Sequence, residues 1–104
     1  MAEHAESTWT FLTNHAHVLL AIAAEPDLRL RDVADRIGIT ERAAQRIVAE
    51  LETAVYLDVR RVGRRNVYRV HRNRPMRHPA ERHHKVGELL AVLAHDQSGR
   101  RAIS

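Results

Sequence analysis

A run of arginines between residues 59 and 80 is the most chemically distinctive feature of the sequence. This stretch holds eight arginines and no acidic residue. The whole chain has a net charge of +4, so the remainder carries −4, since 9 basic residues there stand against 13 acidic ones. Guanidinium groups concentrated in this way attract polyanions, and nucleic-acid phosphate is the commonest such partner. A solvated basic hairpin without a partner is the alternative, and the lack of acidic residues argues against it. The eight arginines are Arg60, Arg61, Arg64, Arg65, Arg69, Arg72, Arg74 and Arg77.

A second group of polar residues, from 40 to 46, has the chemistry needed to read base edges. Arg42, Gln45 and Arg46 fall on the outer face of a predicted helix over residues 41–55. Arginine can form two hydrogen bonds with O6 and N7 of guanine, and glutamine can form two with N6 and N7 of adenine. Ala43, beside them, is small enough to contact a thymine methyl group. Thr40 is a good N-cap, and its hydroxyl and the first free amides of the helix suit a phosphate.

This helix needs a partner that sets its angle, and the preceding residues predict one. Val33, Ala34 and Ile37 have the spacing of a short helix over 31–37, preceded by a short extended piece at 28–30. Gly38 stands where a C-terminal cap needs positive φ, and Ile39 is apolar. In a helix-turn-helix, this arrangement lets the second helix enter the major groove. The buried face of that second helix is predicted to hold Ala44, Ile47, Val48 and Leu51.

The elements around this pair complete a predicted fold. Thr13 can cap an apolar helix over 14–24, which Pro26 ends. Two short strands, at 57–60 and 67–71, flank a turn at 63–66, where Gly63 and Asn66 tolerate turn geometry. A final helix over 80–96 carries an apolar stripe. We therefore predict an α+β, mainly α fold: a winged helix-turn-helix with an additional C-terminal helix. Its parts are an N-terminal arm (1–12), the winged domain (13–71), a basic linker (72–79), the last helix (80–96) and a polar tail (97–104).

The composition excludes several functional classes. A chain of 104 residues fits a single domain, and the absence of cysteine excludes disulfides, thiolate metal sites and cysteine nucleophiles. No apolar run reaches the roughly 20 residues of a membrane span, and the N-terminus has no secretory signal. All three serines lie near the ends of the chain, at 7, 98 and 104, so a rigid serine nucleophile is not expected. We expect no enzymatic activity and no membrane association.

At the stretch from Leu30 to Glu52, continued by Tyr56–Leu57 and by residues 61–68, the chain resembles winged helix-turn-helix transcriptional regulators of the MarR type. The resemblance covers roughly residues 14–71. It implies that Arg42, Ala43, Gln45 and Arg46 read bases and that Arg64 and Arg65 form a wing tip at the minor groove. Arg60, Arg61 and Arg69 are expected at the wing or on phosphates. The terminal flanks are short, closer to the small ArsR-type arrangement. The implied protein is a cytoplasmic bacterial repressor, located on the nucleoid when bound.

Apolar residues outside the winged core predict an interface. Seven apolar side chains would be exposed to solvent if the winged domain formed a complete core without them. We expect these side chains to form the interface of a two-fold dimer. The alternative is that the last helix folds back on the first helix of its own chain. The predicted interface residues are Trp9, Phe11, Leu12, Val86, Leu89, Leu90 and Leu93.

Three further interpretations stay open. A winged helix can serve as a protein-interaction module without binding DNA. An ArsR-like metal sensor is another, because the sequence has eight histidines and pairs His84 with Glu88 at i, i+4. Zinc needs three or four convergent ligands, however, so we expect neither a metal nor a cofactor. The third is a regulator that responds to a small-molecule effector.

Overall fold

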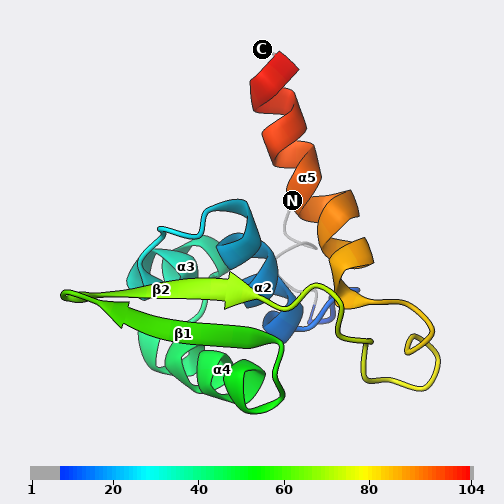
Figure 1. The fold of residues 1–104 in the computed structure, drawn as a ribbon, viewed down its shortest axis with the longest axis horizontal. Helices are drawn as coiled ribbons and strands as arrows, with labels where there is room; N and C mark the ends of the chain where they lie inside the picture. Colours follow the sequence, from blue (N-terminus) through cyan, green and yellow to red (C-terminus); the bar gives the residue numbers. More distant parts are fainter. Residues whose placement is uncertain (1–7, 104) are drawn as a thin grey trace.

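The computed structural model describes residues 8–103, with side chains from 8 to 94. Three helices pack together, a two-stranded hairpin lies along them, and a last helix stands at the far end from the hairpin tip (Figure 1). This mainly helical winged helix confirms the predicted fold class. The elements are α2 (Asn14–Ala24), α3 (Leu30–Ile37), α4 (Glu41–Thr53), β1 (Leu57–Val62), β2 (Arg65–Val70) and α5 (Val86–Ile103).

Side-chain caps start α2 and α4 as predicted. Thr13 Oγ1 accepts a hydrogen bond from the Ala16 amide at 3.2 Å, and Thr40 Oγ1 accepts one from the Ala43 amide at 3.0 Å. Gly38 ends α3 in the left-handed region with φ 81°. The Gly38 and Thr40 caps help to fix the relative orientation of α3 and α4, because only residues 38–40 separate the two helices.

Two helix boundaries differ from the prediction. Leu30 was predicted to be extended, but it is the first residue of α3. Its half-buried side chain continues the apolar face formed by Val33 and Ala34, which favours the helix. Helix α4 stops at Thr53, two residues before the predicted end. Val55 there adopts φ 68°, and the Tyr56 amide donates to the Leu51 carbonyl at 2.9 Å. This pairing is a Schellman cap, which closes the helix before residue 55.

The hairpin is longer than predicted. Its strands pair in antiparallel register from Leu57 opposite Val70 to Val62 opposite Arg65, so only two residues form the turn. Gly63 supplies the positive φ, 62°, that such a short turn requires. Leu57 and Tyr68 are buried and hold the hairpin on the helices.

The core is mainly aliphatic, with Tyr56 and Tyr68 also buried in it, and it joins every element. It contains the predicted buried face of α4 together with residues from α2, α3, the hairpin and α5. Its fully buried large side chains are Val18, Ile22, Val33, Ile47, Leu57 and Leu90.

The last helix begins at Val86, so the predicted start at residue 80 is wrong. The chain before it doubles back: the Met76 amide donates to the His84 carbonyl at 3.0 Å, and the Gly87 amide donates to the Arg72 carbonyl at 2.9 Å. Those bonds require irregular backbone over 77–85. The predicted tail is also wrong for residues 97–103, which continue α5; they contain no proline, and arginine and alanine there favour helix.

Helix α5 packs against α2 of the same chain. The alternative to a dimer predicted this packing, and it applies to part of the apolar face of α5. Val86 and Leu90 are buried and Leu89 is half-buried. Leu93 is 40% exposed and Phe11 92% exposed, so apolar side chains remain at the surface. Across residues 8–103, no helix has both the length and the hydropathy to cross a membrane.

The first turn of α5 is capped by Glu88, which predicts an acid-sensitive helix start. Glu88 Oε2 accepts from the Lys85 amide at 2.8 Å, and His84 Nδ1 lies 2.6 Å from Oε1. These two contacts, the amide bond first, lower the pKa of Glu88 below its ordinary value of 4.5. The wild type should therefore be more stable than Glu88→Gln above about pH 4.5 and lose that advantage as the pH falls further. Urea unfolding of both proteins from pH 7 to pH 3 measures this. A difference that does not change with pH would contradict the cap.

Candidate nucleic-acid interface

The outer face of α4 presents three of the four predicted base-reading residues to solvent. Arg42, Gln45 and Arg46 are exposed, while Ala43 is half-buried beside them. The buried residues Ala44 and Ile47 hold the opposite face against the core. The first half of α4 therefore offers donor and acceptor groups on a rigid support.

The start of α4 has the features of a phosphate contact. The Thr40 hydroxyl is used as an acceptor by the Ala43 amide, which leaves its proton free to donate. The backbone amides of Glu41 and Arg42 lie in the first turn, where helical geometry provides no acceptor. These donors, with the positive end of the helix dipole, suit an anion.

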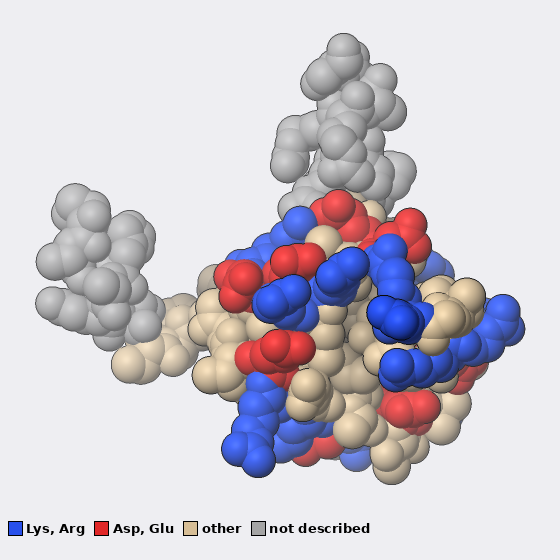
Figure 2. Space-filling model, turned by 90° about the vertical axis from the view of Figure 1, so that its left-hand side faces the viewer, with Lys and Arg blue, Asp and Glu red and all other residues tan. Residues whose placement is uncertain are grey.

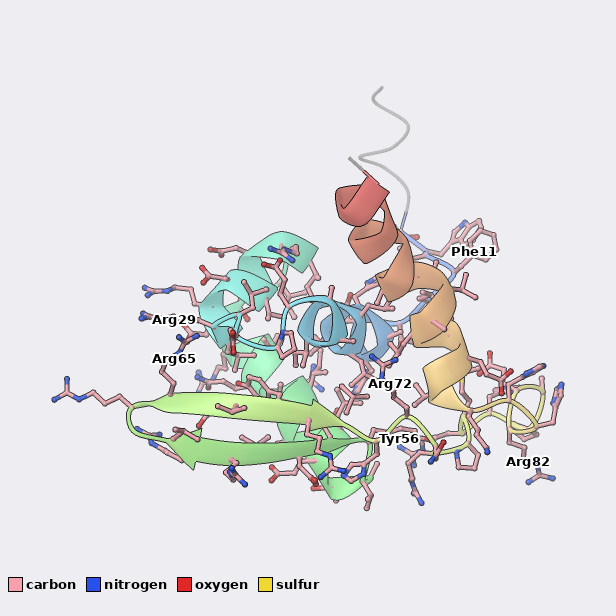
Figure 3. The ribbon with its side chains drawn as sticks, turned by 45° about the horizontal axis from the view of Figure 1, so that its top comes forward. Phe11, Arg29, Tyr56, Arg65, Arg72 and Arg82 are labelled. Carbon is pink, nitrogen blue, oxygen red and sulfur yellow. The ribbon has the colours of Figure 1, made fainter. Side chains whose placement is uncertain are left out.

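The hairpin arginines occupy distinct positions rather than one cluster. The register puts Arg60 and Arg69 on the face away from Leu57, and Arg61 on the same face as Leu57; all three are exposed. Arg64 lies in the turn itself. Arg65 instead turns back toward the α2–α3 connection, where Arg29 lies, and its guanidinium donates to the Asp27 carbonyl (Figure 3). Of the two arginines predicted at the wing tip, Arg64 lies in the turn, whereas Arg65 binds the α2–α3 connection.

The surface around the hairpin tip is mixed in charge. Basic side chains gather in several groups at this end of the molecule, with acidic side chains between them (Figure 2). The sequence alone placed the positive charge in the hairpin, and the fold brings acidic residues from other elements near it. Close contacts with phosphate therefore matter more here than a uniform positive field.

Arg46 has a partner that sequence reasoning missed. Its Nη1 lies 3.3 Å from Glu50 Oε2, and His15 of α2 places Nε2 2.6 Å from Glu50 Oε1. The hydrogen bond from His15, and then the charge of Arg46, lower the pKa of Glu50. The i, i+4 spacing of Arg46 and Glu50 could have indicated this pair, whereas nothing local connects His15 to it.

The linker after the hairpin is held to the end of α4. Arg74 Nη2 donates to the Ala54 carbonyl at 3.0 Å, and its guanidinium lies 5.5 Å from the centre of the Tyr56 ring. The Tyr56 hydroxyl donates to the Pro75 carbonyl. Part of the basic stretch therefore has a structural role away from the hairpin tip.

Five of the seven predicted interface residues line an open groove of about 1000 Å³ between α2, α4, α5 and the 76–81 loop. These five are Phe11, Leu12, Val86, Leu89 and Leu90, whereas Leu93 is not part of this lining. Arg46, Glu50 and Arg77 supply charge at its walls. Trp9 stacks edge-on against Phe11 with ring centres 5.2 Å apart, outside the groove lining.

The histidines do not converge on a metal site within the described part of the chain. No group of three or more histidine or carboxylate side chains there could hold an ion. His84 pairs with Glu88, as its spacing predicted, and its ring lies 4.3 Å from that of His83.

Two helices joined by a tight turn, followed by an antiparallel hairpin, define this protein as a winged helix-turn-helix. A sequence model of the MarR family matches residues 10–65, more than half of the chain. The chain belongs to the MarR family of transcriptional regulators. Members of that family are DNA-binding proteins rather than enzymes.

A solved structure supports the same assignment. The PcaV transcriptional regulator from Streptomyces coelicolor, determined in complex with its natural ligand, is similar with a TM-score of 0.52 and 28% sequence identity. The match covers 65% of this chain and 50% of PcaV, so the present chain corresponds to about half of that regulator. No curated protein matches the chain.

Proposed function

We propose that this protein is a dimeric, sequence-specific DNA-binding repressor that reads the major groove with α4 and contacts the minor groove or backbone with the β1–β2 hairpin. The observation that carries this proposal is that Arg42 and Gln45 are exposed on the first half of α4, while Arg64 is exposed in the turn of the hairpin. A helix fits the major groove, which is about 12 Å wide. Thr40 and Arg60, Arg61 and Arg69 supply phosphate contacts.

Exposed apolar side chains support the dimer. Phe11, Val92 and Leu93 are 92%, 62% and 40% exposed, and Trp9 is 68% exposed. A two-fold pair would bury such residues and present two copies of α4 to half-sites roughly 34–36 Å apart. Repression then needs only occupancy of a promoter. Sedimentation equilibrium measures the dimer, and a monomer at micromolar concentration would contradict it.

The proposed function is tested by selecting binding sites from a random duplex library. The selected pool should contain a pseudo-palindrome that binds about 10³-fold or more tightly than random duplex. Equal binding of the two duplexes would contradict sequence reading. Negligible binding to any duplex at moderate salt, with a stable complex to another protein, would favour the interaction module instead.

Arg64 and Arg65 should differ in their effect on salt dependence. Arg64→Ala removes a free guanidinium at the turn, so the slope of log K against log salt should fall by about one. Arg65→Ala should change the slope by clearly less, because its guanidinium donates to the Asp27 carbonyl. Anisotropy titrations from about 50 to 200 mM salt measure both slopes. Equal changes would contradict the separate roles.

We propose the groove as the site of a small-molecule effector. PcaV was determined with its natural ligand, and here the groove has apolar walls and Arg77, which forms no ion pair among the described residues and suits an organic anion. Glu50 and Glu81 line the same groove, and Glu50 pairs with Arg46. Leu89→Trp should narrow the groove and weaken the effector response by a larger factor than it weakens duplex binding. A panel of aromatic and aliphatic carboxylates, scored by release from DNA, tests this. No release by any member would contradict the site for this chemical class.

A further inference from the structure

Glu50 lies where the groove, α2 and the reading face of α4 meet. His15 Nε2 lies 2.6 Å from Glu50 Oε1. Arg46 Nη1 lies 3.3 Å from Glu50 Oε2 and 3.5 Å from Oε1. The side chains of His15 and Glu50 are 44% and 49% exposed. A base-reading arginine is thus tied, through one carboxylate, to a neighbouring helix.

This contact is not needed to hold α2 and α4 together. Val18 and Leu19 of α2 are buried with Ile47 and Leu51 of α4 in the same core. Exposed ion pairs contribute little to folding. The geometric consequence is larger, because a guanidinium held at one end has fewer directions in which to reach a phosphate or a wrong base.

We propose that Glu50, itself oriented by His15, is a positioning residue that restrains Arg46 and thereby raises sequence discrimination. This inference rests on the proposed function. With this restraint, Arg46 leaves the Glu50 carboxylate only where a base offers a good bidentate acceptor. Without it, Arg46 contacts the backbone of any duplex.

The test compares binding to the selected site and to random duplex for Glu50→Gln. Affinity for random duplex should rise, and the ratio of the two dissociation constants should fall about fivefold, the size expected from losing one exposed pair and part of one base contact. The salt slope on random duplex should steepen by about one, because Arg46 gains a phosphate. If Glu50→Gln changes only the stability of the fold, the ratio of dissociation constants and the salt slope stay unaltered, and the proposal is overturned.

Glu52→Gln is the matched control, since it removes the same charge from an exposed position on the same helix. It should shift both affinities equally and leave the ratio unchanged. In an Arg46→Ala background, Glu50→Gln should also leave the ratio unchanged. The proposal is overturned if Glu52→Gln lowers the ratio as much as Glu50→Gln, or if the fall persists without Arg46.

A measurement without DNA separates this inference from the proposed function. The carboxylate of Glu50, followed by carbon NMR, should titrate with a pKa below the ordinary glutamate value in the wild type. Its pKa should rise in His15→Gln and in Arg46→Ala, and an unchanged pKa in both would overturn the positioning role. Failure of the proposed function appears differently, as absent duplex binding in the wild type and every variant alike.

Discussion

Replacing Arg42 with alanine should lower affinity for the selected duplex by about 5-fold to 150-fold, corresponding to ~1–3 kcal/mol for one lost bidentate base contact. The side chain is exposed near the start of α4, where a recognition helix meets base edges, and removing it creates no cavity. The free energy of unfolding should therefore change by less than about 0.5 kcal/mol. Anisotropy titration with the selected site and with the three single-base variants at each position measures the loss and shows where preference relaxes.

The control for Arg42→Ala is Arg82→Ala. Arg82 lies on the loop at the end of the molecule opposite Arg65, so its loss changes net charge equally without touching α4 (Figure 3). Its effect on affinity should be small and independent of sequence. If Arg82→Ala costs as much as Arg42→Ala, or if the latter weakens all duplexes equally, Arg42 acts through charge alone.

Substituting Gly87 with alanine should destabilise the protein by about 1–3 kcal/mol, the usual cost of overpacking. A Cβ on Gly87 would lie 2.8 Å from both the carbonyl oxygen and the Cβ of Arg72. The clash is with backbone, and the Gly87 amide also donates to that carbonyl at 2.9 Å, so neither segment can move without breaking the bond. The gain in helix propensity, about 1 kcal/mol, offsets only part of this cost. Urea unfolding gives the free energy.

The expected damage is local to the start of α5. Amide hydrogen exchange should accelerate at Gly87 and Val86, whose amides donate to Arg72 and Arg74, and remain slow in α4. Ala91→Ser, at an exposed position of the same helix, is the control and should change stability by less than about 0.5 kcal/mol. A stable Gly87→Ala protein with unchanged exchange would show that the close approach to Arg72 is not required.

Local patterns predicted the helix-turn-helix well because its signals lie within a few residues of one another. Apolar spacing gave the buried face of α4, Thr13 and Thr40 marked two helix starts, and Gly38 marked a helix end. Each depends on a nearby backbone bond or on burial of one helix face.

The errors occurred where distant residues decide the structure. The start of α5 depends on backbone bonds between 72–76 and 84–87, which no periodicity reveals. The anchoring of Arg65 on Asp27 joins segments 38 residues apart, and the contact of His15 with Glu50 joins segments 35 apart. Val55 is a β-branched residue in a left-handed conformation, where sequence preference would expect glycine.

Methylation interference on the selected duplex tests most directly whether α4 and the hairpin contact the same stretch of DNA. Methylation at guanine N7 obstructs the major groove, and methylation at adenine N3 obstructs the minor groove. Interference should appear at both kinds of site within one half-site. The guanine signal should weaken in Arg42→Ala, and the adenine signal in Arg64→Ala. Interference from one groove only, or none at either, would contradict simultaneous recognition by helix and hairpin.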